Sequence, residues 1–422
     1  MSGAGPNVGL PEAADLPGLP LDEDDVALAA LAGPPFQSWD RLHRLLEGRL
    51  PAAAWWAVRG GRAGPGPARA AARVSLADVA ARHAAKGVAI RRLGTSAYPL
   101  VLAEDHEAPP VLFTWGSIDV LEADRPRVAM IGTRRCTNYG RDVARQLGRE
   151  LAEAGVSVVS GLAAGIDGAA HDGALAGGGA PPVGVVGSGL DVVYPRRHAV
   201  LWERVAGAGL LLSEAPLGCR PEPWRFPARN RIIAALAHVL VVVESDVRGG
   251  SMHTVRAAEE RGVPVLAVPG PIRSRASSGT NQLLSQGCHP VCDTADVLTA
   301  LSLAGAYQVP ASSGPSPGPA VPGCPADPPS ASEWPSASDP PAAADRPSAT
   351  DPPSASASGG ARLRPCPPEE FAPVLDALDW TPASLDALLA RLDVPPLRVS
   401  AALAWLEREG WAHNQGGWWE RR

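Results

Sequence analysis

The segment Arg127-Val-Ala-Met-Ile131-Gly-Thr-Arg134 decides the fold, because it sets a pattern that the chain then repeats. A short apolar run ends at a glycine, and the amphipathic stretch Tyr139–Ala154 follows with apolar residues at helical spacing. Further apolar runs alternate with helical stretches: Val156–Ser160, Val183–Gly187, Leu210–Ser213, Val239–Glu244 and Val263–Val268. Apolar strands separated by helices are typical of a doubly wound, mainly parallel α/β sheet. We therefore predict that fold class.

Glycines or small hydroxyl residues mark four junctions at which a predicted strand or loop meets a helix. The junctions are Ile131-Gly-Thr-Arg134, Ser160-Gly-Leu-Ala-Ala-Gly-Ile-Asp167, Phe226-Pro-Ala-Arg-Asn-Arg-Ile232 and Gly249-Gly-Ser-Met-His-Thr254. Doubly wound sheets bind ligands beyond the carboxyl ends of their strands, where free N–H groups and positive helix ends gather. The sequence therefore predicts a phosphate-binding edge.

Arginines add to this edge. Arg225, Arg229 and Arg231 fall within seven positions, which favours a nucleic-acid backbone over a lone nucleotide. Arg134 has two interpretations. Its planar guanidinium suits a phosphate, which it would bind through two parallel hydrogen bonds, or it is an exposed arginine in an ordinary βα turn. On this view, replacing Arg134 or Arg229 with alanine weakens single-strand binding and leaves folding intact.

Five other side chains lie near the junctions. Tyr194, Trp224 and Phe226 either stack on bases or belong to the core. Asp167 would repel a phosphate, so we expect it to brace its loop. His171 lies one helical turn further on and is predicted to be a buried structural histidine.

Most enzymatic signatures are missing from the sequence. Gly187-Ser-Gly189 is not completed as a dinucleotide-binding loop, because residue 192 is Val192, and there is no Walker A motif. No Ser/His/Asp or Cys/His arrangement has credible spacing, and the six cysteines form no zinc-site pattern. We expect no cofactor, no metal and no catalytic residue.

Composition divides the chain into five predicted parts. Residues 1–25 are expected to be an acidic disordered terminus and residues 26–97 a small helical domain in two pieces. Residues 98–305 form the α/β domain, which opens with an extended proline-rich connector. Residues 306–365 are a Pro/Ala/Ser-rich linker. Residues 366–422 are predicted to be a winged helix.

The winged-helix prediction rests on four features. They are a helix over Glu369–Leu378, a second helix capped by Thr381-Pro382, a third over Leu397–Glu409 and a hairpin over Gly410–Trp419.

Charge is unevenly distributed, although the net charge is −6. Residues 26–98 hold 11 basic and 3 acidic residues, and residues 125–300 hold 19 and 15. These two positive blocks are compatible with a polyanion partner. The winged helix holds 5 basic and 9 acidic residues, so contact with a protein is favoured there over reading a DNA groove.

The N-terminus and the hydropathy pattern bear on location. The first 25 residues hold six acids and no base, the reverse of a targeting signal, and no apolar run reaches membrane-span length. We expect a cytoplasmic protein with reduced thiols and no membrane contact.

In the order and spacing of its motifs, the chain resembles the DNA-processing protein A (DprA/Smf) family of single-stranded-DNA-binding proteins. The matching motifs are Gly132-Thr-Arg134, Ser160–Asp167, Gly189-Leu-Asp-Val-Val-Tyr-Pro195, Ser213-Glu-Ala-Pro216, Phe226–Ile232, Ala267-Val-Pro-Gly270 and Gly279-Thr-Asn281. They cover about residues 98–300. The N-terminal block resembles the family's small sterile-alpha-motif-like or helix-hairpin-helix-like domain, and the C-terminal block resembles its winged helix.

The resemblance implies an extended Rossmann-like domain that forms a homodimer and binds single-stranded DNA without catalysis. Such proteins protect incoming DNA during natural transformation and help to load a RecA-type recombinase past single-strand-binding protein. Carried over by motif, the implied DNA-binding residues are Gly132, Thr133, Arg134, Ser160, Gly161, Gly165, Arg196, Arg229, Asn230, Arg231, Gly250 and Ser251.

The sequence departs from the family pattern in three places. Gly249-Gly-Ser251 replaces Ser-Gly-Ser, His198 stands where Asn is common, and Gly33-Pro-Pro35 replaces the expected Gly-x-Gly hairpin. Two rival functions also stay open. One is a phosphoribohydrolase-like enzyme that uses the Gly249–Thr254 loop with Glu259 or Glu260, and the other is a duplex-binding regulator that uses the winged helix.

Overall fold

The computed structural model describes residues 21–33, 39–122, 125–307, 367–378, 383–415 and 417–421. The chain divides into two units, one made of residues 1–309 with 366–422 and the other of residues 310–365. The N-terminus up to residue 20 and almost all of the expected Pro/Ala/Ser linker therefore lie outside the described residues.

A nine-stranded sheet in the order β1-β2-β6-β5-β4-β3-β7-β8-β9 forms the centre of the α/β domain. The strands are β1 (Ala89–Arg92), β2 (Val111–Gly116), β3 (Arg127–Ile131), β4 (Ser157–Ser160), β5 (Val183–Val185), β6 (Leu210–Ser213), β7 (Val239–Val242), β8 (Val265–Ala267) and β9 (His289–Pro290). The strands from β6 to β9 pair in parallel, whereas β1 and β2 pair antiparallel at one edge. The predicted mainly parallel α/β class is confirmed. The strand order reverses direction between β3 and β7, which is the switch point at which such sheets bind ligands.

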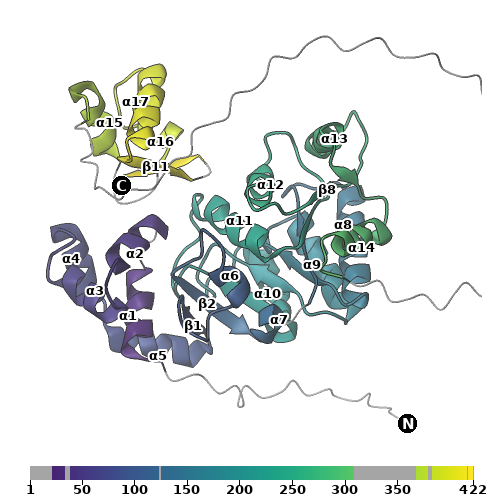
Figure 1. The fold of residues 1–422 in the computed structure, drawn as a ribbon, viewed down its shortest axis with the longest axis horizontal. Helices are drawn as coiled ribbons and strands as arrows, with labels where there is room; N and C mark the ends of the chain where they lie inside the picture. Colours follow the sequence, from purple (N-terminus) through teal and green to yellow (C-terminus); the bar gives the residue numbers. More distant parts are fainter. Residues whose placement is uncertain are drawn as a thin grey trace, which may run out of the picture. The chain divides into compact units, whose positions relative to one another are not determined.

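Helices cover both faces of this sheet (Figure 1). One face packs against α8 (Asn138–Glu153), α9 (Ile166–Gly177) and α14 (Thr294–Leu303). The other packs against α11 (Arg225–Leu236), α12 (Met252–Glu259) and α13 (Ser278–Ser285). Strand β3 alternates accordingly, with Val128 and Met130 in the first core and Ala129 and Ile131 in the second. The remaining elements of the domain are α6 (Leu100–Ala103), α7 (Asp119–Glu122), η1 (Arg196–His198), α10 (Ala199–Ala208) and η2 (Arg275–Ser277).

The connector before the α/β domain is more regular than its prolines indicate. Residues 111–116, predicted to be merely extended, form β2 and pair with β6. Pro109 and Pro110 lie just before this strand, where their missing N–H groups remove no ladder hydrogen bond. The connector is extended over these residues as predicted, and its pairing within the sheet was not predicted.

The N-terminal block contains five helices instead of two pieces. They are α1 (Glu23–Leu31), α2 (Trp39–Leu46), α3 (Pro51–Arg59), α4 (Pro65–Ala72) and α5 (Leu76–Lys86), and strand β1 follows them and joins the sheet.

Helix α1 begins inside the stretch predicted to be disordered. Asp22 caps it, and the Arg92 guanidinium lies 3.0, 3.0 and 3.3 Å from the carboxylates of Asp22, Asp24 and Asp25. These acidic residues are ordered because a strand that is distant in sequence supplies their counter-charge.

The C-terminal part is a small helical domain with a three-stranded sheet, as a winged helix requires. Its elements are η3 (Glu369–Phe371), α15 (Ala372–Ala377), β10 (Ala383–Ser384), α16 (Leu385–Leu389), α17 (Pro396–Arg408), β11 (Ala412–Gln415) and β12 (Trp418–Arg421). The helix cap was misplaced in the prediction. Ser384 caps α16 through the Ala387 amide, and Thr381-Pro382 lies outside the described residues.

Glycines let α8 and α9 approach each other at backbone distance, which yields a test of this packing. A methyl group on Gly173 would lie 2.1 Å from the Arg145 carbonyl oxygen, whereas one on Gly207 of α10 would meet nothing within 4 Å. We expect Gly173→Ala to lower the free energy of unfolding by at least about 2 kcal/mol through steric overlap. The matched variant Gly207→Ala should raise it by up to about 1 kcal/mol. Urea denaturation followed by circular dichroism measures both, and equal tolerance of the two changes would contradict the close packing.

Candidate nucleic-acid interface at the carboxyl edge of the sheet

Main-chain hydrogen bonds join the loops that follow β3, β4 and β7. The Thr133 amide donates to the Glu244 carbonyl oxygen at 2.7 Å, and the Ile166 amide donates to the Thr133 carbonyl oxygen at 3.3 Å. A methyl group on Gly132 or on Gly165 would lie within 2.7 Å of these neighbouring segments. The switch point thus brings two of the four predicted junctions into direct contact beside the end of β7.

The buried carboxylate of Glu244 fixes the start of α8. It accepts hydrogen bonds from the Thr137 amide at 2.8 Å and the Thr137 hydroxyl at 2.6 Å. Gly140 leaves room for it, since a methyl group there would lie 2.3 Å from the carboxylate. The Thr137 hydroxyl oxygen in turn caps α8 by accepting from the Gly140 amide. The loop that carries Arg134 is therefore held at both ends.

The β4–α9 loop is a turn with two residues at positive φ. Leu162 has a positive φ of 52° and Gly165 one of 87°. Among the described residues, no acceptor is paired with the amides of residues 162–165, and α9 has no side-chain cap. Successive main-chain N–H groups in left-handed turns at a helix start make an anion-binding site. The predicted phosphate site of Ser160, Gly161 and Gly165 lies at this turn and stays a prediction. The Ser160 hydroxyl itself is buried and donates to the Met130 carbonyl oxygen at 2.5 Å.

Arg229 supports this loop from within the protein. Its buried guanidinium lies under Gly161, donates to the Val185 carbonyl oxygen and is 3.9 Å from the Asp167 carboxylate. Burial lowers the pKa of Arg229 to about 10, so the side chain stays charged at neutral pH. Sequence reasoning treated Arg229 as a solvent-facing phosphate ligand, whereas the structure makes it a buried charge beneath the turn.

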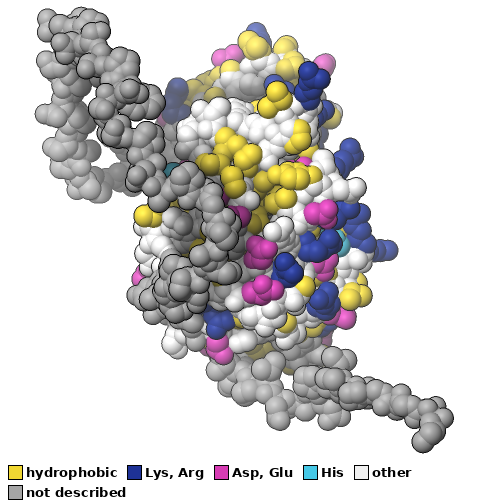
Figure 2. Space-filling model, turned by 90° about the vertical axis from the view of Figure 1, so that its right-hand side faces the viewer, with side chains coloured by type: hydrophobic (Ala, Val, Ile, Leu, Met, Phe, Trp, Pro, Cys, Tyr) yellow, Lys and Arg dark blue, Asp and Glu magenta, His cyan; other side chains and the backbone are white. Residues whose placement is uncertain are grey.

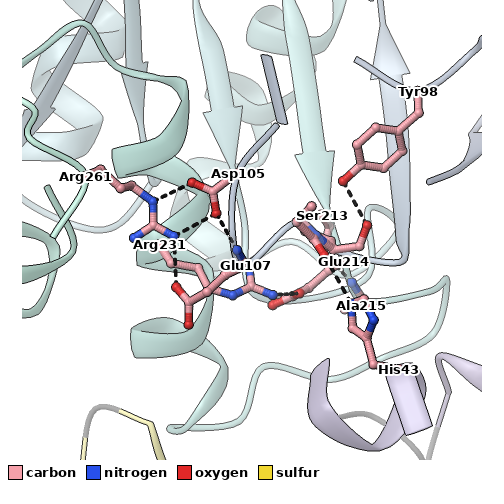
Figure 3. A network of polar contacts seen from close by, with 11 residues as sticks. His43, Tyr98, Asp105, Glu107, Ser213, Glu214, Ala215, Arg231 and Arg261 are labelled. Carbon is pink, nitrogen blue, oxygen red and sulfur yellow. Dashed lines mark hydrogen bonds and ion pairs between the residues drawn. The ribbon is translucent and has the colours of Figure 1, made fainter. Parts of the chain in front are cut away.

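Arg231 points elsewhere, into a polar network (Figure 3). It is buried and lies 2.6 Å from Glu214, in the region where Arg261 pairs with Asp105 and Glu107 at 2.7 and 2.8 Å. The Arg261 pairs tie the connector before β2 to the end of α12, and the Arg231 pair ties α11 to the loop after β6. Arg231 is therefore not an exposed phosphate ligand as predicted, because its side chain is buried and pairs with the carboxylate of Glu214 after β6.

Asn230 lies between these two arginines on α11. It is partly exposed, and its side-chain oxygen accepts from the Arg229 guanidinium at 3.0 Å.

Arg134 is exposed and stacks on an aromatic ring. Its guanidinium carbon lies 4.6 Å from the centroid of the Phe226 ring, and the Phe226 and Tyr194 rings lie 5.4 Å apart. Tyr194 is 43% exposed. A guanidinium and two aromatic rings thus form a partly exposed stack, which we call the Arg134 stack. Trp224, by contrast, is buried and belongs to the core.

The other predicted residues lie at the ends of nearby loops. Arg196 is exposed in η1, directly after Pro195, and Gly250 is exposed with open space around it. The Ser251 hydroxyl is buried and lies 2.7 Å from the Ser245 hydroxyl. Ser251 thus braces the β7–α12 loop, while Gly250 leaves the main chain accessible.

Some basic residues near this edge were not among the predicted site residues. Arg135, Arg248 and Arg273 are exposed in the loops after β3, β7 and β8. Arg275 is exposed too, and it pairs with Asp246. The signal that could have found them is an arginine shortly after each predicted strand. Figure 2 shows one face of the molecule on which dark blue Lys and Arg side chains gather along one side.

The structural roles predicted for Asp167 and His171 are confirmed. The Asp167 carboxylate accepts from the Gly161 amide at 3.2 Å and faces Arg229. His171 is fully buried, and its ring nitrogens lie 3.0 and 3.1 Å from the carbonyl oxygens of Asp167 and Val183. Burial lowers the pKa of His171.

Among the described residues, no helix is long and apolar enough to cross a membrane, and no group of three or more His, Cys, Asp and Glu side chains is placed to hold a metal ion.

Two profiles of known protein families match the chain. A family profile described as DNA recombination-mediator protein A matches residues 90–302, about half of the chain. A second, described as DprA winged helix domain, matches residues 339–417.

The chain belongs to the DprA family.

Individual relatives agree with this assignment. A putative DNA processing protein DprA of Mycobacterium tuberculosis is 44% identical over 191 residues, which cover 45% of this chain and 49% of that protein. DprA of Streptococcus pneumoniae is 41% identical over 201 residues, which cover 48% of this chain and 70% of that protein. The chain thus spans about half the length of the mycobacterial DprA that it matches.

Solved DprA structures are similar as well. DprA of Streptococcus pneumoniae overlays with a TM-score of 0.54 at 32% identity and covers 65% of this chain and 95% of that chain. A Helicobacter pylori DprA structure, described for its single-stranded DNA binding mode, has a TM-score of 0.46 at 31% identity and covers 52% of this chain and 97% of that chain.

The contrast between Arg229 and Arg134 yields a stability test. We expect Arg229→Ala to lower the free energy of unfolding by about 3 kcal/mol, because it leaves the largely buried Asp167 without its counter-charge. Arg134→Ala, at an exposed position, should change it by less than about 0.5 kcal/mol. This replaces the expectation from sequence that both variants fold normally. Chemical denaturation of both variants measures the difference, and a stable Arg229 variant would contradict the buried role.

Proposed function

We propose that this protein binds single-stranded DNA at the carboxyl edge of its sheet, protects it, and loads a RecA-type recombinase onto it. The observation that carries the proposal is the Arg134 stack beside the turn after β4. Phosphates suit the unpaired amides and exposed arginines, and unpaired bases suit the aromatic rings. Both components are sequence-tolerant, as a recombination mediator requires.

We infer that the protein acts by binding and not by catalysis. The carboxylates nearest the edge are already engaged. Asp167 faces Arg229, Glu244 binds Thr137, and Asp246 pairs with Arg275. A phosphoribohydrolase-like enzyme needs a carboxylate free to act on its substrate. Glu259 and Glu260, its candidates from sequence, lie at the far end of α12 from the loop. This arrangement favours a DNA binder.

The proposal includes the partners that the family resemblance implies. They are single-stranded DNA, a RecA-type recombinase, single-strand-binding protein and a second copy of the chain in a homodimer. A homodimer would place two sites on one strand and raise avidity without new contacts. We place this activity in the cytoplasm, where recombination takes place.

Binding of fluorescent oligo-dT across a salt series tests the DNA site. We expect Arg134→Ala to lower the slope of log K against log salt by about 0.7, the value for one phosphate contact on a single strand. Phe226→Leu should weaken binding by about 1–3 kcal/mol through lost stacking with little change in slope. Arg204→Ala is the matched control, because Arg204 is exposed and pairs with Asp172 on a neighbouring helix. Equal binding by all four proteins would contradict the proposed site.

Recombinase loading needs a separate assay. On DNA coated with single-strand-binding protein, wild type should shorten the lag before RecA filaments form, and Arg134→Ala should restore much of that lag. Normal DNA binding without any effect on the lag would rule out the loading role and leave the binding role intact.

A further inference from the structure

The hairpin formed by α3 and α4 is a strongly basic surface outside the site described above. From Gly48 to Ala77 the chain contains five arginines and no Asp or Glu. The five, Arg49, Arg59, Arg62, Arg69 and Arg73, are all exposed. No acidic side chain within the hairpin offsets them, so this surface attracts polyanions.

The hairpin is firmly anchored on its other side. Trp55 and Val58 of α3 and Ala71 of α4 are buried in the same core as α1. The Ala52 amide donates to the Asp24 carboxylate at 2.9 Å, which ties α3 to α1. The arginines therefore project from a fixed support, and ordering them on a ligand costs little backbone entropy.

The turn between α3 and α4 contains two glycines with open space around them. Gly61 and Gly64 have positive φ values of 91° and 96°, and a methyl group built on either meets nothing within 4 Å. Arg62 lies between them, and an extended phosphate chain can approach its main chain closely. The family pattern leads one to expect a glycine hairpin at Gly33, whereas the structure has a glycine turn at residues 60–64.

Side-chain contacts separate the arginines into two groups. Arg69 donates to the Pro65 carbonyl oxygen at 3.2 Å, and Arg59 stacks on Trp56 at 5.5 Å. The guanidinium groups of Arg49, Arg62 and Arg73 make no hydrogen bond or ion pair with the residues that the structure describes, although their main-chain amides are bonded. Trp56 is itself 52% exposed. Exposed guanidinium groups and an exposed indole on one hairpin are a combination with which proteins hold a nucleic-acid backbone and stack a base.

We propose that the α3–α4 hairpin is a second DNA-contact surface that binds the phosphodiester backbone. Arginine suits this ligand because its planar guanidinium binds two phosphate oxygens at once. The hairpin would engage DNA that extends beyond the edge of the sheet, either the same single strand or an adjoining duplex.

The test is the full-length double variant Arg62→Gln/Arg73→Gln. Its matched control is Arg145→Gln/Arg149→Gln, which removes two exposed arginines that pair with carboxylates of their own helix. The probes are oligo-dT of about 10 nucleotides, within the length that one compact single-strand site covers, and oligo-dT and duplex of about 60. Thermal melting followed by circular dichroism confirms that both variants fold.

We expect the hairpin variant to bind the short oligo-dT like wild type and to bind a long probe more weakly. Two lost single-strand contacts lower the salt slope by about 1.4, so the affinity lost between about 50 and 200 mM salt becomes about sevenfold smaller. A loss confined to the long oligo-dT or to the duplex identifies which DNA the hairpin contacts. Trp56→Ala should then weaken the single strand and spare the duplex.

Binding of both long probes equal to that of the control variant would overturn the proposal. Failure of every protein to bind the short oligo-dT would count against the site at the edge of the sheet. The duplex would still report on the hairpin, so the two failures can be told apart.

Discussion

The candidate site depends on the close approach of three strand ends at the switch point. Thr133 is bound on one side by the Glu244 carbonyl oxygen and on the other by the Ile166 amide. This approach is possible only because Gly132 and Gly165 lack side chains. Since parallel strands point their carboxyl ends to one edge, the helix starts and the exposed Arg134 gather there. Any larger residue at either glycine would separate the loops and disrupt the turn after β4.

Much of the fold could be predicted because its signal is local. Strands β3 and β6 follow from apolar runs buried on both faces. Strands β1 and β2 were missed because they pair antiparallel at an edge. Neither the antiparallel pairing nor the contacts that hold Arg92 against α1 leave a periodic trace in the sequence. The start of the first helix was predicted too late in the chain for the same reason. Arg92, which lies 67 or more residues further along, stabilises its acidic first residues.

The meeting of the loops after β3 and β4 follows from the predicted parallel sheet, and the direction of the arginines near them does not. Arg134, Arg229 and Arg231 look alike in sequence, yet only Arg134 faces solvent. Arg229 turns inward because Gly161 leaves a space that its guanidinium fills, and Arg231 turns toward Glu214. Both partners are distant in sequence, so motif spacing carries no information about them. The buried Arg229 still supports the site, because its guanidinium lies beneath the turn after β4.

The central claim is that single-stranded DNA binds at the carboxyl edge of the sheet, and hydrogen exchange tests it most directly. Amide exchange rates would be measured by mass spectrometry with and without saturating oligo-dT. The amides of residues 162–165 have no acceptor in the described structure and should exchange fast in the free protein. Oligo-dT should slow exchange there and in the loop that carries Arg134. Unchanged exchange in both loops, with DNA protecting a different part of the chain, would contradict the account.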